Sequence, residues 1–403
     1  MIIICSKLIT GKTYNLPLDN AAVVINEGII QAVGSSKLIT RRFHGQRTTC
    51  LENAVIMPGL VNTHTHLELP ALVKDGRSRT FPDWVLNLVR VKKNLRREDY
   101  HTAAVQNIGT LIQSGTTTVG EICTHGVSQA LLKRSGLRAV VFHEIIGMGQ
   151  TFDIPLPSTS NSALVRIGIS PHSPYTVSEK VLCAISALSR QRKIKLAMHI
   201  AESADEIRLL QRKKSGLEKI YQFAEWDLAG APRGSSSIEY LCRIGFLSSA
   251  LLAVHAVHVK DRDIAIMRKA KVSIAHCPRS NKAIGVGRMP LKQILNAGIS
   301  VGLGTDSLAS SPSLNMWDEM RFALRIHKRD GIRAEDVIRI ATIGGAKSLG
   351  LADDIGTLER GKKADLIAVP LPWKNTGDLC SDLLRETKSC IMTVVNGKVL
   401  HRE

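Results

Sequence analysis

The chain contains, from residue 57 to residue 66, the sequence Met57-Pro58-Gly59-Leu60-Val61-Asn62-Thr63-His64-Thr65-His66. The apolar run 54–57 enters a Pro-Gly turn, and a second short run, Leu60-Val61, ends in His-Thr-His. Alternate side chains of a strand point the same way, so His64 and His66 would project together from one strand end. Two imidazoles aimed at one point make half of a metal site. The pair alone fits two polar loop residues equally well, so other parts of the chain must supply the remaining ligands.

The middle of the chain alternates between short apolar runs and amphipathic helical stretches. Seven further runs resemble strands, at residues 116–121, 139–144, 165–170, 195–200, 251–255, 272–276 and 300–304. Helical patterns lie between them, for example at 181–189 and 261–270. With the strand that ends at His66, this makes eight βα units over about 290 residues, which predicts an α/β fold of the TIM-barrel, (β/α)8 type. A doubly wound sheet would need a glycine-rich dinucleotide turn, and none follows the first strand.

Both ends of the chain have a different, β-rich character. Near the start, 22–25 and 29–34 are β-branched runs that flank the turn Asn26-Glu27-Gly28, which is a hairpin signal. Near the end, Asn396-Gly397 makes a similar turn after the run 391–395. We therefore expect a small composite β-sandwich domain that is formed by both termini. Its predicted segments are residues 1–56 and 352–403, and the predicted catalytic barrel spans residues 57–351.

Composition limits the functional classes. The chain has 403 residues, of which 44% are hydrophobic and 22% charged, as expected for a globular protein. It has no apolar stretch of about 20 residues, so we expect no membrane partner. The eight cysteines are scattered, which favours reduced thiols and a cytoplasmic location.

The formal net charge of +19 raises the question of an acidic partner such as nucleic acid. The basic runs 90–97, 190–195 and 212–214 fall in helix-like sequence, and aromatic residues make up only 4% of the chain. Without aromatic side chains between the basic residues to stack on bases, these runs fit solvated helix faces better. We therefore expect a small-molecule substrate and no nucleic acid. The sequence leaves open whether the protein forms a homo-oligomer.

Polar residues collect at the carboxyl ends of the predicted strands. In a barrel these ends share one mouth, where catalytic groups lie. A single histidine there could be a satisfied core residue, but a set at matching strand ends favours a site. The set comprises His64 and His66 at the first strand, His172 after the fourth, His199 at the fifth, His255 at the sixth, His276 at the seventh and Asp306 after the eighth.

These side chains indicate a metal-assisted hydrolysis. Imidazole and carboxylate ligands suit zinc, iron or manganese. Four of them, His64, His66, His199 and Asp306, would bind one ion and leave room for a water. Glu202 follows His199 by three residues and is the candidate general acid/base, although a salt-bridged surface glutamate is the alternative interpretation. His255 would orient or polarise the attacking water.

The chain resembles the amidohydrolase superfamily, in the aminohydrolase branch that contains cytosine, guanine and adenosine-derivative deaminases and triazine chlorohydrolases. The resemblance covers nearly the whole chain. It rests on segments 58–66, 114–118, 171–175, 199–202, 276–281, 304–307 and 356–366.

The resemblance implies a (β/α)8 barrel, a composite β-sandwich and one divalent metal ion. We expect this ion to be zinc, with Fe2+ and Mn2+ as alternatives. It implies that the metal ligands are His64, His66, His199 and Asp306, and that Asp306 also takes a proton from the water. Glu202 and His255 would be catalytic, and His172 would contact the substrate. Binuclear relatives carry a modified lysine near the end of the fourth strand, and Ile169-Ser170-Pro171-His172 has none, which favours a single metal.

The resemblance also suggests a substrate class. The pattern Pro171-His172-Ser173-Pro174-Tyr175 is that of methylthioadenosine and S-adenosylhomocysteine deaminases, whereas 81–85 and 236–241 resemble aminodeoxyfutalosine deaminases. We therefore expect a hydrolytic deaminase of a 5′-substituted adenosine, with Glu68 holding the ribose. We further expect Trp84 and Glu144 to contact the substrate, although Trp84 could instead be helix core. The alternatives are a free-base deaminase or a triazine-type chlorohydrolase on the same site, and a metal-free relative.

Overall fold

The computed structural model describes residues 1–14, 16–71, 80–149, 163–373 and 376–403. Eight strands form one parallel sheet in which neighbours in the chain are neighbours in the sheet. All eight strands predicted from the sequence are present. Their bounds are β5 Leu60–Thr65, β6 Thr116–Cys123, β7 Arg138–Ile145, β8 Val165–Pro171, β9 Lys195–Ile200, β10 Leu251–His255, β11 Ser273–His276 and β12 Val301–Leu303.

The first and last strands of this sheet lie side by side and close the barrel. Thr65 and Asp306 form a parallel β-bridge. The backbone N–H of Asp306 donates to the carbonyl oxygen of His64 at 3.0 Å, and the Thr63 hydroxyl donates to the carbonyl oxygen of Leu303 at 2.8 Å. The predicted TIM barrel is confirmed, and its closure brings the two ends of the catalytic segment together.

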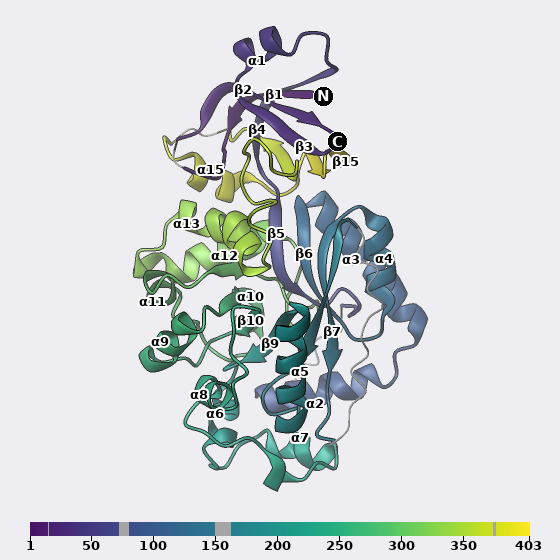
Figure 1. Cartoon of the computed structure of the whole chain (residues 1–403), viewed down its shortest axis with the longest axis vertical. Coiled ribbons are helices and arrows are strands. Elements are labelled where there is room, and N and C mark those ends of the chain that lie inside the picture. Colours follow the sequence, from purple (N-terminus) through teal and green to yellow (C-terminus); the bar gives the residue numbers. More distant parts are fainter. Residues whose placement is uncertain (15, 72–79, 150–162, 374–375) are drawn as a thin grey trace.

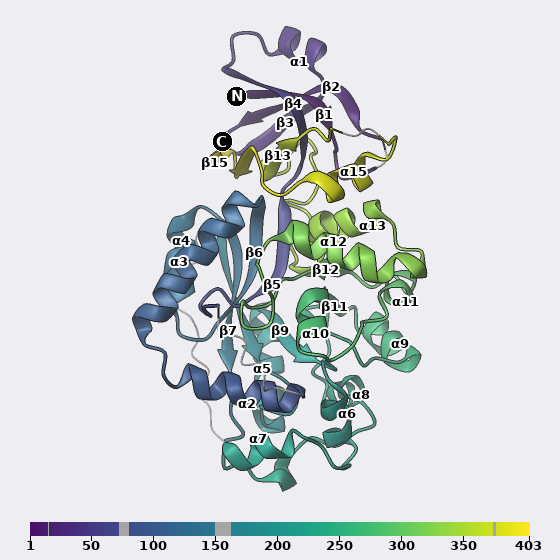
Figure 2. The same ribbon diagram turned by 180° about the vertical axis from the view of Figure 1, so that it is seen from behind.

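Helices surround the barrel on the outside, as Figure 1 and Figure 2 show from opposite sides. Side chains that alternate along each strand point into the barrel, as Ala197, Val254 and Ala275 do, or outward against the helices, as Met198 and Ile274 do. The helices are α2 Phe81–Lys92, α3 Arg97–Gln113, α4 Val127–Ser135, α5 Glu179–Arg192, α6 Ala204–Leu210, α7 Glu218–Phe223, α8 Ser237–Arg243, α9 Asp261–Lys269, α10 Pro278–Ala283, α11 Leu291–Asn296, α12 Met316–His327, α13 Ala334–Arg339 and α14 Gly345–Ser348.

Both ends of the chain build a second, seven-stranded sheet of order β15-β14-β13-β4-β1-β2-β3. Only β1 and β4 pair in parallel, and the other neighbours are antiparallel. The predicted terminal β domain is confirmed, while its boundaries at 56/57 and 351/352 stay a prediction. The elements are β1 Ile2–Leu8, β2 Leu18–Asn26, β3 Ile29–Ser35, α1 Ser36–Arg42, β4 Thr48–Pro58, β13 Leu366–Pro370, α15 Leu379–Glu386, β14 Met392–Val395 and β15 Lys398–Arg402.

The terminal sheet caps one end of the barrel and leaves the other end free. In Figure 1 this sheet and both termini lie above the barrel, and β5 runs downward from it. The turn between β4 and β5 needs Gly59, because a Cβ there would lie 2.1 Å from the hydroxyl oxygen of Thr117. The carboxyl ends of the barrel strands therefore point away from the terminal sheet, toward α2 and α7.

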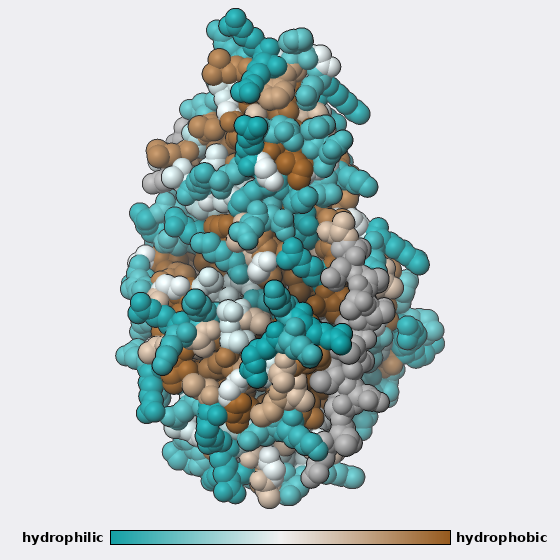
Figure 3. Space-filling model, in the orientation of Figure 1, coloured by the Kyte–Doolittle hydropathy of each residue, from teal (hydrophilic) through white to brown (hydrophobic). Residues whose placement is uncertain are grey.

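The surface shown in Figure 3 is mostly hydrophilic, and apolar side chains lie there in small scattered groups. Within the described ranges, no helix has the length and hydropathy needed to span a bilayer.

Candidate metal centre and active-site cavity

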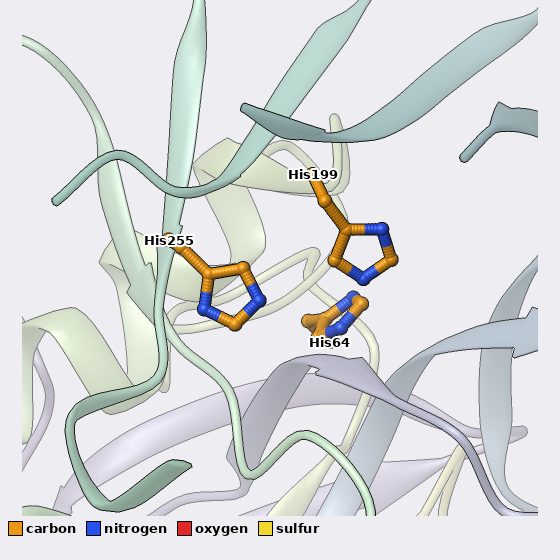
Figure 4. A group of neighbouring side chains, drawn as sticks. All are labelled: His64, His199 and His255. Carbon is orange, nitrogen blue, oxygen red and sulfur yellow. The ribbon is translucent and has the colours of Figure 1, made fainter. Parts of the chain in front are cut away.

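Five of the predicted side chains meet at the carboxyl ends of the barrel strands. Asp306 Oδ1 lies 3.6 Å from His64 Nε2 and 3.5 Å from His66 Nε2. These three residues each offer one ligand atom, and the three atoms lie within 4.8 Å of one another. His64, His199 and His255 form a second group that meets the same limit. Figure 4 shows the imidazoles of this second group turned toward one space.

Unusual backbone conformations help to bring these side chains together. His255 has a φ of 73° and Asp306 a φ of 58°, and Ala201 and Ala256 beside the site also have positive φ. Residues other than glycine rarely adopt this region, and such residues cluster at functional sites. On β10, Leu252 and Val254 point into the barrel, so a regular strand would turn His255 outward. The left-handed conformation instead directs His255 into the mouth.

Hydrogen bonds fix the orientation of the ligand side chains. His199 Nδ1 lies 2.9 Å from the carbonyl oxygen of His172, which can only accept, so Nδ1 carries the proton and Nε2 keeps its lone pair. The hydroxyl groups of Ser280 and Ser310 donate to Asp306 Oδ2 at 2.6 and 2.9 Å, which leaves Oδ1 for the imidazoles. These hydrogen bonds leave His199 Nε2 and Asp306 Oδ1 free to bind a metal ion.

The protonation states also suit metal binding. Burial lowers the pKa of His66 to about 4 and, together with neighbouring imidazoles, lowers the pKa of His199 well below its usual value. Burial alone would raise the pKa of Asp306, but the imidazoles of His64 and His66 hold it well below the usual range. These shifts favour neutral His66 and His199 imidazoles beside an ionised Asp306 carboxylate, and imidazoles with a carboxylate are a common donor set for zinc.

An observation at His64 tests whether these residues fit a metal. Its side chain is fully buried, and neither ring nitrogen has a hydrogen-bond partner among the described residues. Buried polar atoms in native proteins almost always have a partner. A metal ion at the centre would satisfy Nε2, so the donor set and this orphaned nitrogen both fit a metal ligand.

Glu202 lies beside this centre and is only 6% exposed. Its Oε1 is 3.3 Å from His255 Nε2, and His255 Nδ1 lies 2.8 Å from Asn281 Oδ1. The carboxylate of Glu206 accepts the backbone N–H groups of Ala201 and Glu202 at 2.8 and 2.9 Å, which holds this loop in place.

Burial sets the protonation of this pair. Burial, with the nearby charges of Asp306 and Glu206, raises the pKa of Glu202 well above its usual value. Burial lowers the pKa of His255 to about 4. The raised pKa favours the protonated form of Glu202, which is the form that a general acid requires.

A cavity of about 570 Å³ opens from the centre toward α2 and α7. This volume is within the usual range for small-molecule sites. Three residues predicted to contact substrate, His172, Trp84 and Glu144, line it. His172 Nδ1 lies 2.9 Å from the hydroxyl oxygen of Thr176, and Glu144 Oε2 accepts from the Thr124 hydroxyl at 2.7 Å. The Trp84 ring is half-buried and stacks on Phe81.

The structure corrects the expectation for Glu68. This side chain is 2% exposed and does not line the cavity. Its carboxylate accepts backbone N–H groups from Thr124, His125, Val127 and Ser128 at 2.7–3.1 Å, at the start of α4. These bonds occupy both oxygens, so Glu68 is an anchor for a helix start and has no oxygen free for ribose hydroxyl groups.

His276 also lies outside the centre, although it ends a barrel strand. Its neighbours Ala275 and Cys277 point into the barrel, so His276 points outward by the two-residue period of a strand. Its Nε2 lies 3.1 Å from Nε2 of His327 on α12. From the sequence, all strand-end histidines were treated alike. Only the alternation of inward and outward side chains along this strand could have distinguished His276 from the others.

Other residues of the cavity were not singled out from the sequence. Lys92 and Lys93, at the end of α2, line it, although the basic run that contains them was expected to be a solvated helix face. Phe223 and Trp226 line it from the far side. Their helical spacing resembles ordinary amphipathic sequence, so nothing in the sequence pattern distinguished them from surface or core.

Comparison with known proteins agrees with this geometry. The model of the amidohydrolase family matches residues 55–400. A 5-methylthioadenosine/S-adenosylhomocysteine deaminase from Pelotomaculum thermopropionicum is 30% identical over 421 residues, covering 98% of this chain and 92% of that protein. An adenosine deaminase from Xanthomonas campestris with bound zinc is 26% identical, with a TM-score of 0.85 over 99% of this chain and 92% of that one.

A second solved structure supports the fold. The aminofutalosine deaminase from Helicobacter pylori in complex with methylthio-coformycin is 23% identical and has a TM-score of 0.90, with 99% of each chain covered. The family model extends over most of the sequence, from the end of the N-terminal strands through the whole barrel to the last strand. This chain belongs to the amidohydrolase family.

Proposed function

We propose that this protein is a metal-dependent hydrolase that deaminates a 5′-substituted adenosine to the corresponding inosine and releases ammonia. The observation that carries the proposal is the contact of Glu202 with His255, beside the converging imidazoles and the Asp306 carboxylate. The names of similar proteins support the substrate class, since they include methylthioadenosine/S-adenosylhomocysteine and adenosine deaminases. All of these enzymes break a carbon–nitrogen bond of a cyclic amidine.

We propose that one divalent ion, zinc, binds to four side chains. Three of them, His64, His66 and Asp306, already converge, and His199 lies beside His64 with a ring-centroid distance of 5.0 Å. His255 is left out of this set because its Nε2 faces the Glu202 carboxyl group. When bound, such an ion acidifies water and so makes it a nucleophile at neutral pH.

The surrounding residues would handle the protons. Water adds to the amino-bearing ring carbon, and Asp306 takes up the proton that the water loses. Glu202 donates its proton to the adjacent ring nitrogen. The proton held by Asp306 then passes to the amino group, the C–N bond breaks to release ammonia, and the new hydroxyl group returns its proton to Glu202 as the carbonyl forms. His255, with Nδ1 directed to Asn281 Oδ1, would orient the water through Nε2. The pKa of Glu202, which burial raises, suits this donor role.

The nucleoside would contact residues farther along the cavity. His172 would hydrogen bond to the far side of the purine, and Trp84 would pack against the apolar part of the substrate. Glu144 replaces Glu68 as the proposed ribose ligand, because Glu144 lines the cavity and its Oε1 has no hydrogen bond to any described residue. A carboxylate can accept two hydrogen bonds from paired hydroxyl groups.

A deamination screen tests the proposal. The substrates are adenosine, 5′-deoxyadenosine, methylthioadenosine, S-adenosylhomocysteine, aminodeoxyfutalosine and free guanine, and the measurement is ammonia release. We expect one or more 5′-substituted adenosines to be turned over and guanine to be poor. Good turnover of guanine without any adenosine derivative would instead support the free-base alternative on the same metal site.

A further inference from the structure

A short helix, α10, supplies two of the side chains that hold the reacting groups in place. The hydroxyl group of Ser280 donates to Asp306 Oδ2 at 2.6 Å. Asn281 Oδ1 lies 2.8 Å from His255 Nδ1. Both side chains of α10 are buried, and neither is among the described residues that line the cavity. The position of α10 therefore decides where the carboxylate of Asp306 and the imidazole of His255 stand.

This helix needs support from a neighbouring element. It has six residues, Pro278–Ala283, and a helix of that length is not stable on its own. Its second residue, Arg279, donates its backbone N–H to Oε1 of Glu319 on α12 at 2.9 Å. This bond fixes the first turn of α10 directly before Ser280 and Asn281.

The carboxyl group of Glu319 is poorly satisfied for a buried group. The side chain is fully buried, and its Oε2 has no hydrogen bond to any described residue. The Nη1 atom of Arg279 is 3.9 Å from this oxygen. Burying a carboxyl group without a full set of partners costs free energy, which an apolar side chain of similar size would avoid. Stability alone therefore gives little reason for a glutamate here, and what the glutamate adds is the bond to the Arg279 N–H.

We propose that Glu319 is a positioning residue for the deamination. Through the N–H of Arg279 it fixes the first turn of α10, which aims Ser280 and Asn281 at the centre. The cavity lining, as far as the structure describes it, does not include Glu319, so Glu319 affects the reaction only through α10. The inference rests on the proposed deaminase function.

Two substitutions test the accepting oxygen of Glu319. Burial raises the pKa of Glu319 to about 8, which favours the protonated carboxyl group at neutral pH. Its carbonyl oxygen still accepts in that form, and glutamine offers the same oxygen, whereas leucine offers none. We expect Glu319→Leu to lower kcat by about 10- to 100-fold with little change in KM, because displaced reacting groups slow the chemical step. Glu319→Gln should keep kcat within about threefold of the wild type.

A neighbouring residue on the same helix provides the control. Asp318 Oδ2 lies 3.7 Å from Arg279 Nη1, but in the described part of the chain Asp318 makes no hydrogen bond to the backbone of α10. Asp318→Asn should therefore keep the wild-type kcat. All variants are assayed with saturating zinc under conditions where circular dichroism shows that they are folded, so that a loss of stability alone cannot lower kcat.

The rates can overturn the inference in two ways. One is a kcat for Glu319→Leu within about threefold of the wild type, and the other is a kcat for Glu319→Gln as low as that for Glu319→Leu. If Glu319→Leu does not fold, Glu319→Asp decides in the same way, because its shorter side chain withdraws the accepting oxygen from Arg279.

Zinc affinity separates this result from the proposed function. Ser280 holds the carboxylate of Asp306 from behind, and loss of such an outer partner lowers metal affinity by about 10- to 100-fold. Competition with a chelator measures this affinity without any turnover. If none of the adenosine derivatives is deaminated, the proposed function fails, and the affinities still test Glu319. A weaker affinity in Glu319→Leu that is restored in Glu319→Gln supports the inference, and equal affinities in the wild type and Glu319→Leu overturn it.

Discussion

Glu202 is the residue whose environment is most specific to the proposed chemistry. It is 6% exposed and lies 3.3 Å from His255 Nε2, so its proton can move only to groups inside the cavity. Glu202→Gln preserves the shape and removes the acid. We expect kcat to fall by about 10² to 10⁴, the usual contribution of general acid–base catalysis, with metal content unchanged. Steady-state kinetics and metal analysis of the same preparation check this. A loss under about threefold at normal metal content would remove Glu202 from the mechanism.

Single residues also show where sequence reasoning stops. His64 and His66 could be placed together because two residues separate them along a strand. His255 reaches the centre because its φ is positive. His276 lies outside the centre because it occupies an outward-facing position of its strand. Neither the sign of a dihedral angle nor the direction in which a given strand residue points follows from residue type, so the sequence could not separate His276 from the strand-end residues that converge.

At the level of secondary structure, the barrel strands were predictable because each is a short, mostly apolar run that ends near polar or turn residues. The helix-like runs were predictable as helices, but the elements against which these helices pack were not. The basic run 90–97 begins in the last turn of α2 and continues beyond it. Its sequence does not show that Lys92 and Lys93 line a cavity, because this depends on the packing of α2 against α7. Glu68 was misassigned for a similar reason, since its partners lie 56 to 60 residues later at the start of α4.

The start of α4 gives a prediction for Glu68. Its carboxylate accepts four backbone N–H groups, and an amide would turn one nitrogen donor toward N–H donors. We expect Glu68→Gln to lower the free energy of unfolding by about 1 to 3 kcal/mol, from the unsatisfied groups and the lost charge at a helix N-terminus. Urea unfolding measures it. Unchanged stability together with a large rise in KM for nucleosides would restore the ribose role of Glu68.

Across the whole molecule, a buried ion pair joins the barrel to the terminal sheet. Arg138, at the start of β7, donates to both oxygens of Asp365, beside β13, at 2.8 and 3.0 Å. Asp365 also accepts the backbone N–H of Asn396 at 2.8 Å. Both side chains of the pair are buried. Sequence composition indicated two β-rich ends but gave no sign of this contact, because its partners are 227 residues apart.

This pair predicts how the two parts depend on each other. Arg138→Met should destabilise the protein by about 3 to 5 kcal/mol, because it leaves Asp365 buried without its cation. In Arg138→Met/Asp365→Asn the uncompensated charge is gone and an oxygen remains for Asn396, so part of the loss should be recovered. Urea midpoints of the three proteins provide the comparison. A double variant no more stable than Arg138→Met would show that the charge is not the cause.

The metal content of the purified protein tests the central claim, that His64, His66, His199 and Asp306 bind one ion on which catalysis depends. The measurement is metal per chain by mass spectrometry, for the wild type, for His66→Ala and for the control His276→Asn, a strand-end histidine outside the centre. We predict one zinc per chain in the wild type and the control, and loss of both zinc and deaminase activity in His66→Ala. Full metal content and full turnover in His66→Ala would contradict the account.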